Sequence, residues 1–174
     1  MSVARPLTRA ILALGSNLGE REGTLQSAVA ELVDCPEVRL LNVSPVITTK
    51  PVGGPVGQPD FLNMVIAVDT TLSAMELLVH CQSVEQAHHR TRAVRWGART
   101  LDVDIIVYGS VVSADPVLTL PHPRAAERAF VLYPWSLMDP HAMLAGKPVS
   151  ELAAAAADMA GISHVQDVPL PQAP

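Results

Sequence analysis

The chain has 174 residues, 49% of them hydrophobic and 17% charged, a composition typical of one globular domain and not of a disordered protein. Its formal net charge of −5 argues against broad, non-specific binding to nucleic acid. No apolar run reaches the about 20 residues of a membrane span, and the one at 10–14 is too short for a signal peptide. Cys35 and Cys81 lack a metal-ligand spacing, so we expect reduced thiols in a cytoplasmic protein.

Strand and helix patterns alternate along the first part of the chain. Residues 10–14 indicate a buried strand that ends in a turn at 15–19. Residues 20–34 predict a helix, which Pro36 ends. Residues 38–49 and 61–70 predict two further strands. Between these strands, the Pro- and Gly-rich stretch at 50–60 is typical of a binding loop or lid.

A second helix and a fourth strand follow. Ser73 and Glu76 have the spacing of a capping box, which predicts a helix beginning there. An arginine-rich loop at 90–100 leads into a strand at 101–108, whose β-branched residues favour extended structure. Gly109 then begins a turn, and residues 111–113 are expected to return as a short hairpin.

The last third of the chain has weaker patterns. Residues 118–123 predict a strand end broken by proline, and residues 130–135 form another apolar run. Ser150 is placed to cap an alanine-rich helix that ends near Gly161. Residues 165–174 are rich in proline and are expected to be loose.

The predicted element order is β-α-β-β-α-β with additions at the C-terminal end. This order predicts an α+β, ferredoxin-like fold in which an antiparallel sheet is packed by helices. We expect a single domain over residues 1–174, with its core at about 10–140.

The stretch at 95–105 carries the strongest chemical signal. Asp102 and Asp104 are two residues apart in a predicted strand, so both point to one face, about 6–7 Å apart. Paired carboxylates can hold Mg²⁺ through oxygen ligands. Arginines that suit phosphate flank this strand in sequence: Arg90, Arg92, Arg95, Arg99, Arg124 and Arg128. This equipment suits phosphoryl-type transfer. The alternative is a solvated strand face beside a basic loop.

Four stretches in order carry a resemblance to a known family: ALGSNLG at 13–19, GQPDFLN at 57–63, RWGARTLDVDI at 95–105, and LPHP at 120–123 leading to RAF at 128–130. Over about residues 10–140 the chain resembles the 6-hydroxymethyl-7,8-dihydropterin pyrophosphokinases of folate biosynthesis. The resemblance implies transfer of the β,γ-pyrophosphoryl group of ATP to the hydroxymethyl oxygen of the pterin, with release of AMP. It also implies the ferredoxin-like fold and two Mg²⁺ ions bound by Asp102 and Asp104.

The resemblance further implies roles for individual residues. Arg90 and Arg99 match the arginines that contact the transferred phosphates and are the expected catalytic residues. The expected ATP-binding residues are Leu78, Gln82, Glu85, Arg92, Trp96, Ile105, Thr119, His122 and Arg128. The expected pterin-binding residues are Thr49, Val52, Phe61, Asn63 and Phe130. Alternative interpretations remain: His122 as a histidine merely held beside prolines, and both Phe residues as ordinary core residues.

Some features depart from the family pattern. The 90–99 loop is one residue shorter than in some members and lacks a lysine found there. Ala98 replaces a common proline, Lys50 stands where some members have proline, and the 50–60 loop is one residue longer. We expect both loops to be mobile without ligands, with Trp96 closing over bound substrates.

The last expectations concern a possible zinc site, the binding partners and the rival function classes. His80, His88 and His89 suggest a solvated helix end more than a zinc site. We expect a monomer that binds ATP and the pterin, with no nucleic-acid or membrane partner. Two rival classes are a ferredoxin-like nucleic-acid-binding module and a catalytically silent relative that binds pterin or ATP.

Overall fold

The computed structural model describes residues 5–16, 21–50, 59–90 and 101–167. The first part of the chain contains β1 (Thr8–Ser16), α1 (Arg21–Leu32), β2 (Val38–Val43), β3 (Val46–Thr49), β4 (Phe61–Thr70), α2 (Ala74–Arg90) and β5 (Asp102–Tyr108). The second part contains β6 (Ser113–Asp115), β7 (Leu118–Leu120), the 3-10 turn η1 (Ala125–Glu127), α3 (Ala129–Met138), β8 (Met143–Leu144), β9 (Lys147–Pro148), α4 (Val149–Ala155), the 3-10 turn η2 (Met159–Gly161) and β10 (Ile162–Gln166). Predictions about motion at 51–58 and 91–100 fall outside these described residues.

The central sheet has the strand order β10-β3-β4-β1-β5, with β2 also paired to β4. Every pairing in this sheet is antiparallel. Each of the helices α1 and α2 therefore connects two strands that are not neighbours, and another strand lies between those two, as in the split βαβ pattern. The predicted α+β, ferredoxin-like fold is confirmed, with β10 as an added edge strand.

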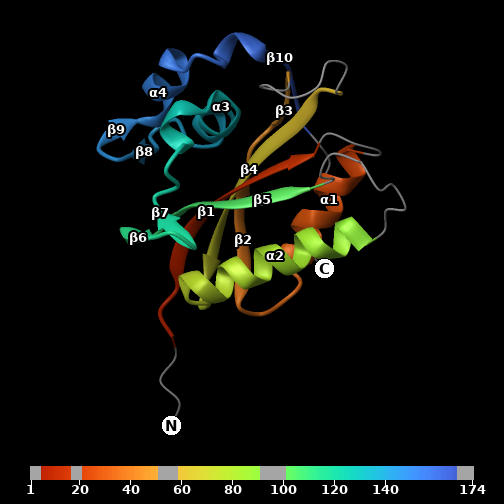
Figure 1. The fold of residues 1–174 in the computed structure, drawn as a ribbon, viewed down its shortest axis with the longest axis vertical. Helices are drawn as coiled ribbons and strands as arrows, with labels where there is room; N and C mark the ends of the chain where they lie inside the picture. The colour runs from red at the N-terminus through yellow and green to blue at the C-terminus, as the bar shows by residue number, and fades with distance from the viewer. Residues whose placement is uncertain (1–4, 17–20, 51–58, 91–100, 168–174) are drawn as a thin grey trace.

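Helices cover both faces of this sheet. Figure 1 shows α1 and α2 on one side, and α3 with α4 on the other. Leu12 and Leu14 of β1 pack into the core under α1 and α2, whereas Ile11 packs into the core under α3 and α4. Side chains alternate between the faces of a strand, so two covered faces require nearly continuous apolar sequence. This explains why β4 reads FLNMVIAVDT with little polar alternation.

Several predicted elements agree with the structure. The helix predicted at 20–34 is α1, and the strand predicted at 61–70 is β4. The capping box is present: the Ser73 N–H donates to Glu76 Oε1 at 2.9 Å, and the Glu76 N–H donates to Ser73 Oγ at 3.1 Å. Leu77, Cys81 and Val84, which share one face of α2, lie in the core.

Three boundaries in the first part of the chain differ from prediction. The strand predicted at 38–49 divides into β2 and β3, because Ser44 Oγ accepts the Val65 N–H at 2.8 Å and Pro45 has no N–H to pair. The turn predicted at 15–19 begins too early, since Gly15 and Ser16 still pair with β4. The hairpin predicted at 111–113 is formed two residues later, by β6 and β7.

The C-terminal predictions were partly wrong. Ser150 does not cap α4: Pro148 holds the N-cap position, and no side chain caps that end. The helix ends at Ala155 and not near Gly161, because Ala156 is already extended, with φ −70° and ψ 137°. Part of the stretch expected to be loose is ordered, since Val165 and Gln166 of β10 pair with Ile47 and Val46 of β3.

Candidate active site

A cavity of about 590 Å³ opens on the α3 side of the sheet. Its floor comes from β1, β3, β4 and β5, and its opposite wall comes from η1, α3 and the segment after α4. The residues from the sheet and its margin are Ala13, Leu14, Gly15, Thr49, Lys50, Phe61, Asn63, Asp102 and Asp104. The residues from the covering layer are Arg124, Glu127, Arg128, Phe130, Val131, Ala157 and Asp158.

Strand register brings the two carboxylates and the expected pterin residues to one face. Asn63 of β4 pairs with Gly15 of β1, and Gly15 pairs in turn with Asp102 of β5. Residues directly opposite in antiparallel strands share a face, and so do residues two apart. Asp104 therefore shares the face of Asp102, and Phe61 shares that of Asn63. The predicted common face of the two carboxylates lines the cavity.

The floor of the cavity contains a buried polar pair. Asn63 is 7% exposed and Thr49 is 6% exposed. The Asn63 amide donates from Nδ2 to Thr49 Oγ1 at 2.8 Å. A Cβ atom at Gly15 would lie only 2.7 Å from Asn63 Oδ1, so glycine leaves this amide its room. The hydrogen bond to Thr49 holds the Asn63 amide in a defined orientation at the cavity floor.

Aromatic side chains line the cavity from two layers. Phe61 comes from β4, and Phe130 comes from α3 in the covering layer. The guanidinium carbon of Arg128 lies 5.4 Å from the centroid of the Phe130 ring, within cation–π range. Phe130 therefore presents an apolar surface that a neighbouring cation helps to hold.

The expected adenosine residues lie apart from this cavity, around the edge of β5 that does not pair with β1. Glu85 of α2 accepts the Val103 N–H through Oε2 at 3.3 Å, and Ile105 is buried in the core shared with α2. Leu78 packs against that core, while Gln82 is exposed. Thr119, on β7, donates from Oγ1 to the Asp115 carbonyl at 2.9 Å. β5 thus separates the carboxylate cavity from this second group.

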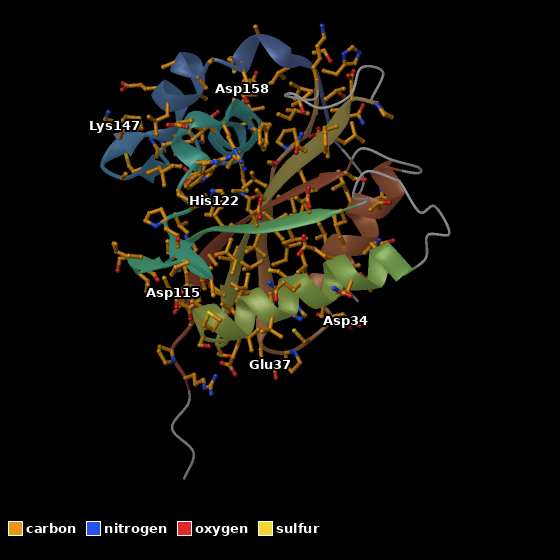
Figure 2. All side chains as sticks on the ribbon, in the orientation of Figure 1. Asp34, Glu37, Asp115, His122, Lys147 and Asp158 are labelled. Atoms are coloured by element: carbon orange, nitrogen blue, oxygen red, sulfur yellow. The ribbon has the colours of Figure 1, made fainter. Side chains whose placement is uncertain are left out.

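His122 lies between the β6–β7 hairpin and the α3 layer (Figure 2). Its backbone N–H donates to the Ile106 carbonyl at 2.8 Å, and its Nδ1 accepts the Arg124 N–H at 3.2 Å. Burial lowers the pKa of His122, and the Arg128 and Arg124 charges lower it further, while the Asp104 charge opposes them. The neutral imidazole is therefore favoured, and its charge environment includes one of the two cavity carboxylates.

The donor set fits a hard divalent cation. Asp102 and Asp104 are half-buried and supply carboxylate oxygens. Among the described residues, no group of three or more His, Cys, Asp or Glu side chains forms a closed site. Mg²⁺ commonly takes one or two carboxylates and completes its coordination with water and substrate phosphates. Two carboxylates on the wall of an open cavity match that pattern.

The remaining predicted site residues fall partly outside the described ranges. Val52, Arg92, Arg95, Trp96 and Arg99 lie there, and Arg90 ends α2 with its side chain outside the description.

His80 Nε2 lies 2.8 Å from the Leu32 carbonyl oxygen, and His88 Nε2 lies 2.9 Å from Glu31 Oε2. These two histidines join α2 to α1.

The cavity residues without an assigned role in the sequence analysis include Glu127, Ala157 and Asp158, together with Lys50, which was noted only as a departure. Arg124 was singled out only as one of the flanking arginines. Ala157 and Asp158 carried no signal, because they fell within a stretch expected to be helical. Their place in the cavity wall depends on how the C-terminal segment folds back.

The model of the family 7,8-dihydro-6-hydroxymethylpterin-pyrophosphokinase (HPPK) matches residues 11–140. Similar curated proteins are named 2-amino-4-hydroxy-6-hydroxymethyldihydropteridine pyrophosphokinase. The Pseudomonas aeruginosa protein is 42% identical over 150 residues, covering 86% of this chain and 92% of its own length. The Methylorubrum extorquens protein is 40% identical over 160 residues, covering 92% of this chain and all of its own length. The similarity thus extends over nearly whole chains.

Solved structures support the same fold. The wild-type HPPK-DHPS of Plasmodium falciparum with SDX-DHP has a TM-score of 0.69 at 13% identity, covering 88% of this chain. The A437G variant with pteroate has a TM-score of 0.68 at 12% identity, again covering 88% of this chain. This chain spans less than half of those solved chains, 45% and 41% respectively. Taken with the sequence matches, these findings show that the chain belongs to the 7,8-dihydro-6-hydroxymethylpterin-pyrophosphokinase family.

Proposed function

We propose that this protein transfers the β,γ-pyrophosphoryl group of ATP to the hydroxymethyl oxygen of 6-hydroxymethyl-7,8-dihydropterin, releasing AMP, as a step of folate biosynthesis. The observation that carries the proposal is the single cavity that joins Phe61, Asn63 and Phe130 to Asp102 and Asp104. A flat heterocycle and a metal–phosphate group can meet there. Family membership supports the same reaction.

The pterin fits between the aromatic residues of the two layers. A planar ring placed between Phe61 and Phe130 gains stacking energy of about 0.5–1.5 kcal/mol per aromatic pair beyond its buried area. The Asn63 amide both donates and accepts, as the pyrimidine edge of a pterin requires. Thr49 orients that amide through the 2.8 Å bond, and Val52 is proposed to complete the pocket through its backbone.

ATP is proposed to bind across β5, with its phosphates toward the cavity. Asp102 and Asp104 would hold Mg²⁺, two ions by analogy with the family. When bound there, Mg²⁺ would neutralise charge on the phosphate oxygens and would polarise the attacking hydroxyl. His122 and Arg128, with Arg90, Arg92 and Arg99, provide donors for phosphate oxygens. The adenosine residues are proposed to be Leu78, Gln82, Glu85, Ile105 and Thr119, with Trp96 closing the site.

The transfer conserves every atom. The hydroxymethyl oxygen forms a bond to the β-phosphorus, and the bond from that phosphorus to the oxygen bridging it to the α-phosphorus breaks. AMP leaves with that oxygen, and the hydroxyl proton passes to water. In such reactions positioning and electrostatic stabilisation supply most of the rate enhancement. The residues of this chain accordingly bind and orient, and none is assigned as a dedicated base.

Three properties of the whole protein belong to the same proposal: one domain, a monomeric state and a cytoplasmic location. Within the ranges that the structure covers, no helix has the length and apolar character needed to cross a membrane. Sedimentation of the purified protein would test the monomeric state directly.

A coupled assay tests the reaction. The purified chain is mixed with ATP, Mg²⁺ and 6-hydroxymethyl-7,8-dihydropterin, AMP is followed with time, and the pterin diphosphate is identified by mass spectrometry. We expect equimolar AMP and pterin diphosphate, and none with 6-methyl-7,8-dihydropterin, which lacks the accepting hydroxyl, or with excess EDTA. ADP in place of AMP, or binding of both ligands without turnover, would refute the assignment; the latter is the outcome for a catalytically silent relative.

A further inference from the structure

The C-terminal segment reaches the cavity from beyond the part of the chain that the family model matches. That match ends at residue 140, whereas Ala157 and Asp158 line the cavity wall. Asp158 lies in the layer of α3 and α4, just before η2 (Figure 2). Residues far along the chain therefore help to shape a cavity whose other walls come from the matched core.

Asp158 makes a specific bond to the start of α3. Its Oδ1 accepts the Ala129 N–H at 2.9 Å. Ala129 is the first residue of α3 and is fully buried, and the N-cap residue Arg128 provides no side-chain cap of its own. A buried N–H without an acceptor is costly, and a carboxylate suits the positive end of a helix. Asp158 therefore caps α3 from a distant part of the chain.

The capped residue lies between two residues of the cavity. Arg128 precedes Ala129 and Phe130 follows it, and both line the cavity with the Arg128 guanidinium 5.4 Å from the Phe130 ring centroid. A bond to the Ala129 N–H fixes the peptide between them. The position of the Phe130 ring over the cavity thus depends on where Asp158 holds the beginning of α3.

Asp158 is itself held from the sheet side. Three residues later the Gly161 carbonyl accepts the Lys50 N–H at 3.2 Å, and Ile162 pairs with Thr49 of β3. Thr49 in turn pairs with Phe61 and bonds to Asn63. A short path therefore connects the sheet wall of the cavity to the helix wall, through residues 158–162.

We propose that Asp158 is a positioning residue for the pterin, which sets the spacing between the Phe61 and Phe130 walls by tying α3 to the strand that carries Thr49. This inference rests on the proposed function. It assigns to Asp158 no contact with the reacting atoms. Without the Asp158 carboxylate the start of α3 is free to move, so only a fraction of the molecules has the spacing that binds pterin. The apparent affinity for pterin is then the intrinsic affinity multiplied by that fraction.

Three substitutions at Asp158 separate hydrogen bonding from charge. Asp158→Ala removes the acceptor, and the usual cost of losing a cap predicts about a five- to tenfold higher KM for pterin. Asp158→Asn keeps Oδ1 in place and should stay within about twofold of the wild type. Asp158→Glu keeps the charge but moves the oxygens by one methylene, so it should raise the pterin KM more than Asn does. The KM for ATP should rise by a smaller factor than the KM for pterin, because Arg128 adjoins Ala129 but the expected adenosine residues lie across β5.

Asp139→Ala is the matched control. Asp139 Oδ1 accepts the His141 N–H at 3.0 Å, the same kind of bond, at the other end of α3. This variant should change neither KM. A purely structural role for Asp158 would lower the amount of active enzyme and the melting temperature without separating the two KM values.

The outcomes are decisive when pterin binding is also measured by calorimetry. A selective rise in pterin KM and Kd for Asp158→Ala, with rescue by Asn, supports the inference. Equal rises for both substrates, no rise, or a larger effect of Asn than of Glu overturns it. If Asp158→Ala does not fold, the Asn and Glu pair still decides the question. A wild type that binds pterin but releases no AMP refutes the proposed function alone, because the binding comparison still stands.

Discussion

Replacing Gly15 with alanine should weaken pterin binding while leaving the protein folded. The new Cβ atom would lie 2.7 Å from Asn63 Oδ1, closer than carbon and oxygen can approach, with the Leu62 carbonyl oxygen 3.9 Å away. The backbone of β1 is held by β4 and β5 on its two sides, so the Asn63 side chain must turn. Turning it breaks the 2.8 Å bond to Thr49 and misaligns the amide expected to face the pterin.

The two energetic effects differ in size. Loss of the Asn63–Thr49 bond costs about 1 kcal/mol of stability, and alanine in place of glycine in a strand returns about 0.5–1 kcal/mol, so the free energy of unfolding should change little. A misplaced buried amide costs binding about 2 kcal/mol, because donors and acceptors on the pterin lose their partners. That corresponds to about a thirtyfold higher Kd for the pterin.

Calorimetric titration with the pterin and urea unfolding measure these two quantities separately. Asp139→Ala serves again as the control, since Asp139 bonds to the His141 N–H at the far end of α3 and its loss should leave the pterin Kd unchanged. Unchanged pterin affinity in Gly15→Ala would refute the argument that Asn63 needs this space. A large loss of stability with normal affinity would show that the strain is absorbed by the strand and not by the amide.

Removing either carboxylate, in Asp102→Ala or Asp104→Ala, should reduce AMP release by orders of magnitude without changing the circular dichroism spectrum; near-normal turnover would refute the metal assignment. Phe130→Ala should weaken pterin binding in calorimetry much more than ATP binding, because its ring lies in the carboxylate cavity and not with the adenosine group; equal weakening would count against the sandwich. Burial, with a further contribution in the same direction from the Glu85 and Asp104 charges, raises the pKa of the Cys81 thiol from its ordinary value of 9.0 to about 12. The unfolded thiol ionises first, so stability should fall as pH rises from about 9 to 12, and Cys81→Ala should flatten that slope in pH-dependent urea unfolding; an unchanged slope would contradict this assignment.

Sequence patterns predicted those parts of the fold that depend on local chemistry. The capping box at Ser73 and Glu76 works through bonds between residues three apart, so spacing alone identifies it. The common face of Asp102 and Asp104 follows from the two-residue period of a strand. Both predictions agree with the structure because each depends only on residues that are close together in the sequence.

The C-terminal part could not be predicted in the same way. Alanine has the highest helix propensity, which favoured a helix continuing to Gly161. The structure instead turns at Ala156, and the Asp158 carboxylate caps α3, 29 residues earlier in the chain. A bond between such distant residues leaves no periodic trace. Because of this long separation in sequence, Asp158 could not be predicted as a cavity residue, whereas Asn63 and Phe130 were identified through the family resemblance.

The row formed by Asn63, Gly15 and Asp102 makes the site sensitive to strand length in a particular way. Three neighbouring strands place the amide and the carboxylate two interstrand spacings apart, about 10 Å, and the backbone ladder maintains that interval. Deleting a single residue before Gly15 within β1 would bring a larger side chain into the row and exchange the inward and outward faces of the strand. Insertions in the connecting loops cost far less. We therefore expect active variants of different chain length to have their insertions and deletions in the loops that connect the strands, and hardly any within the strands.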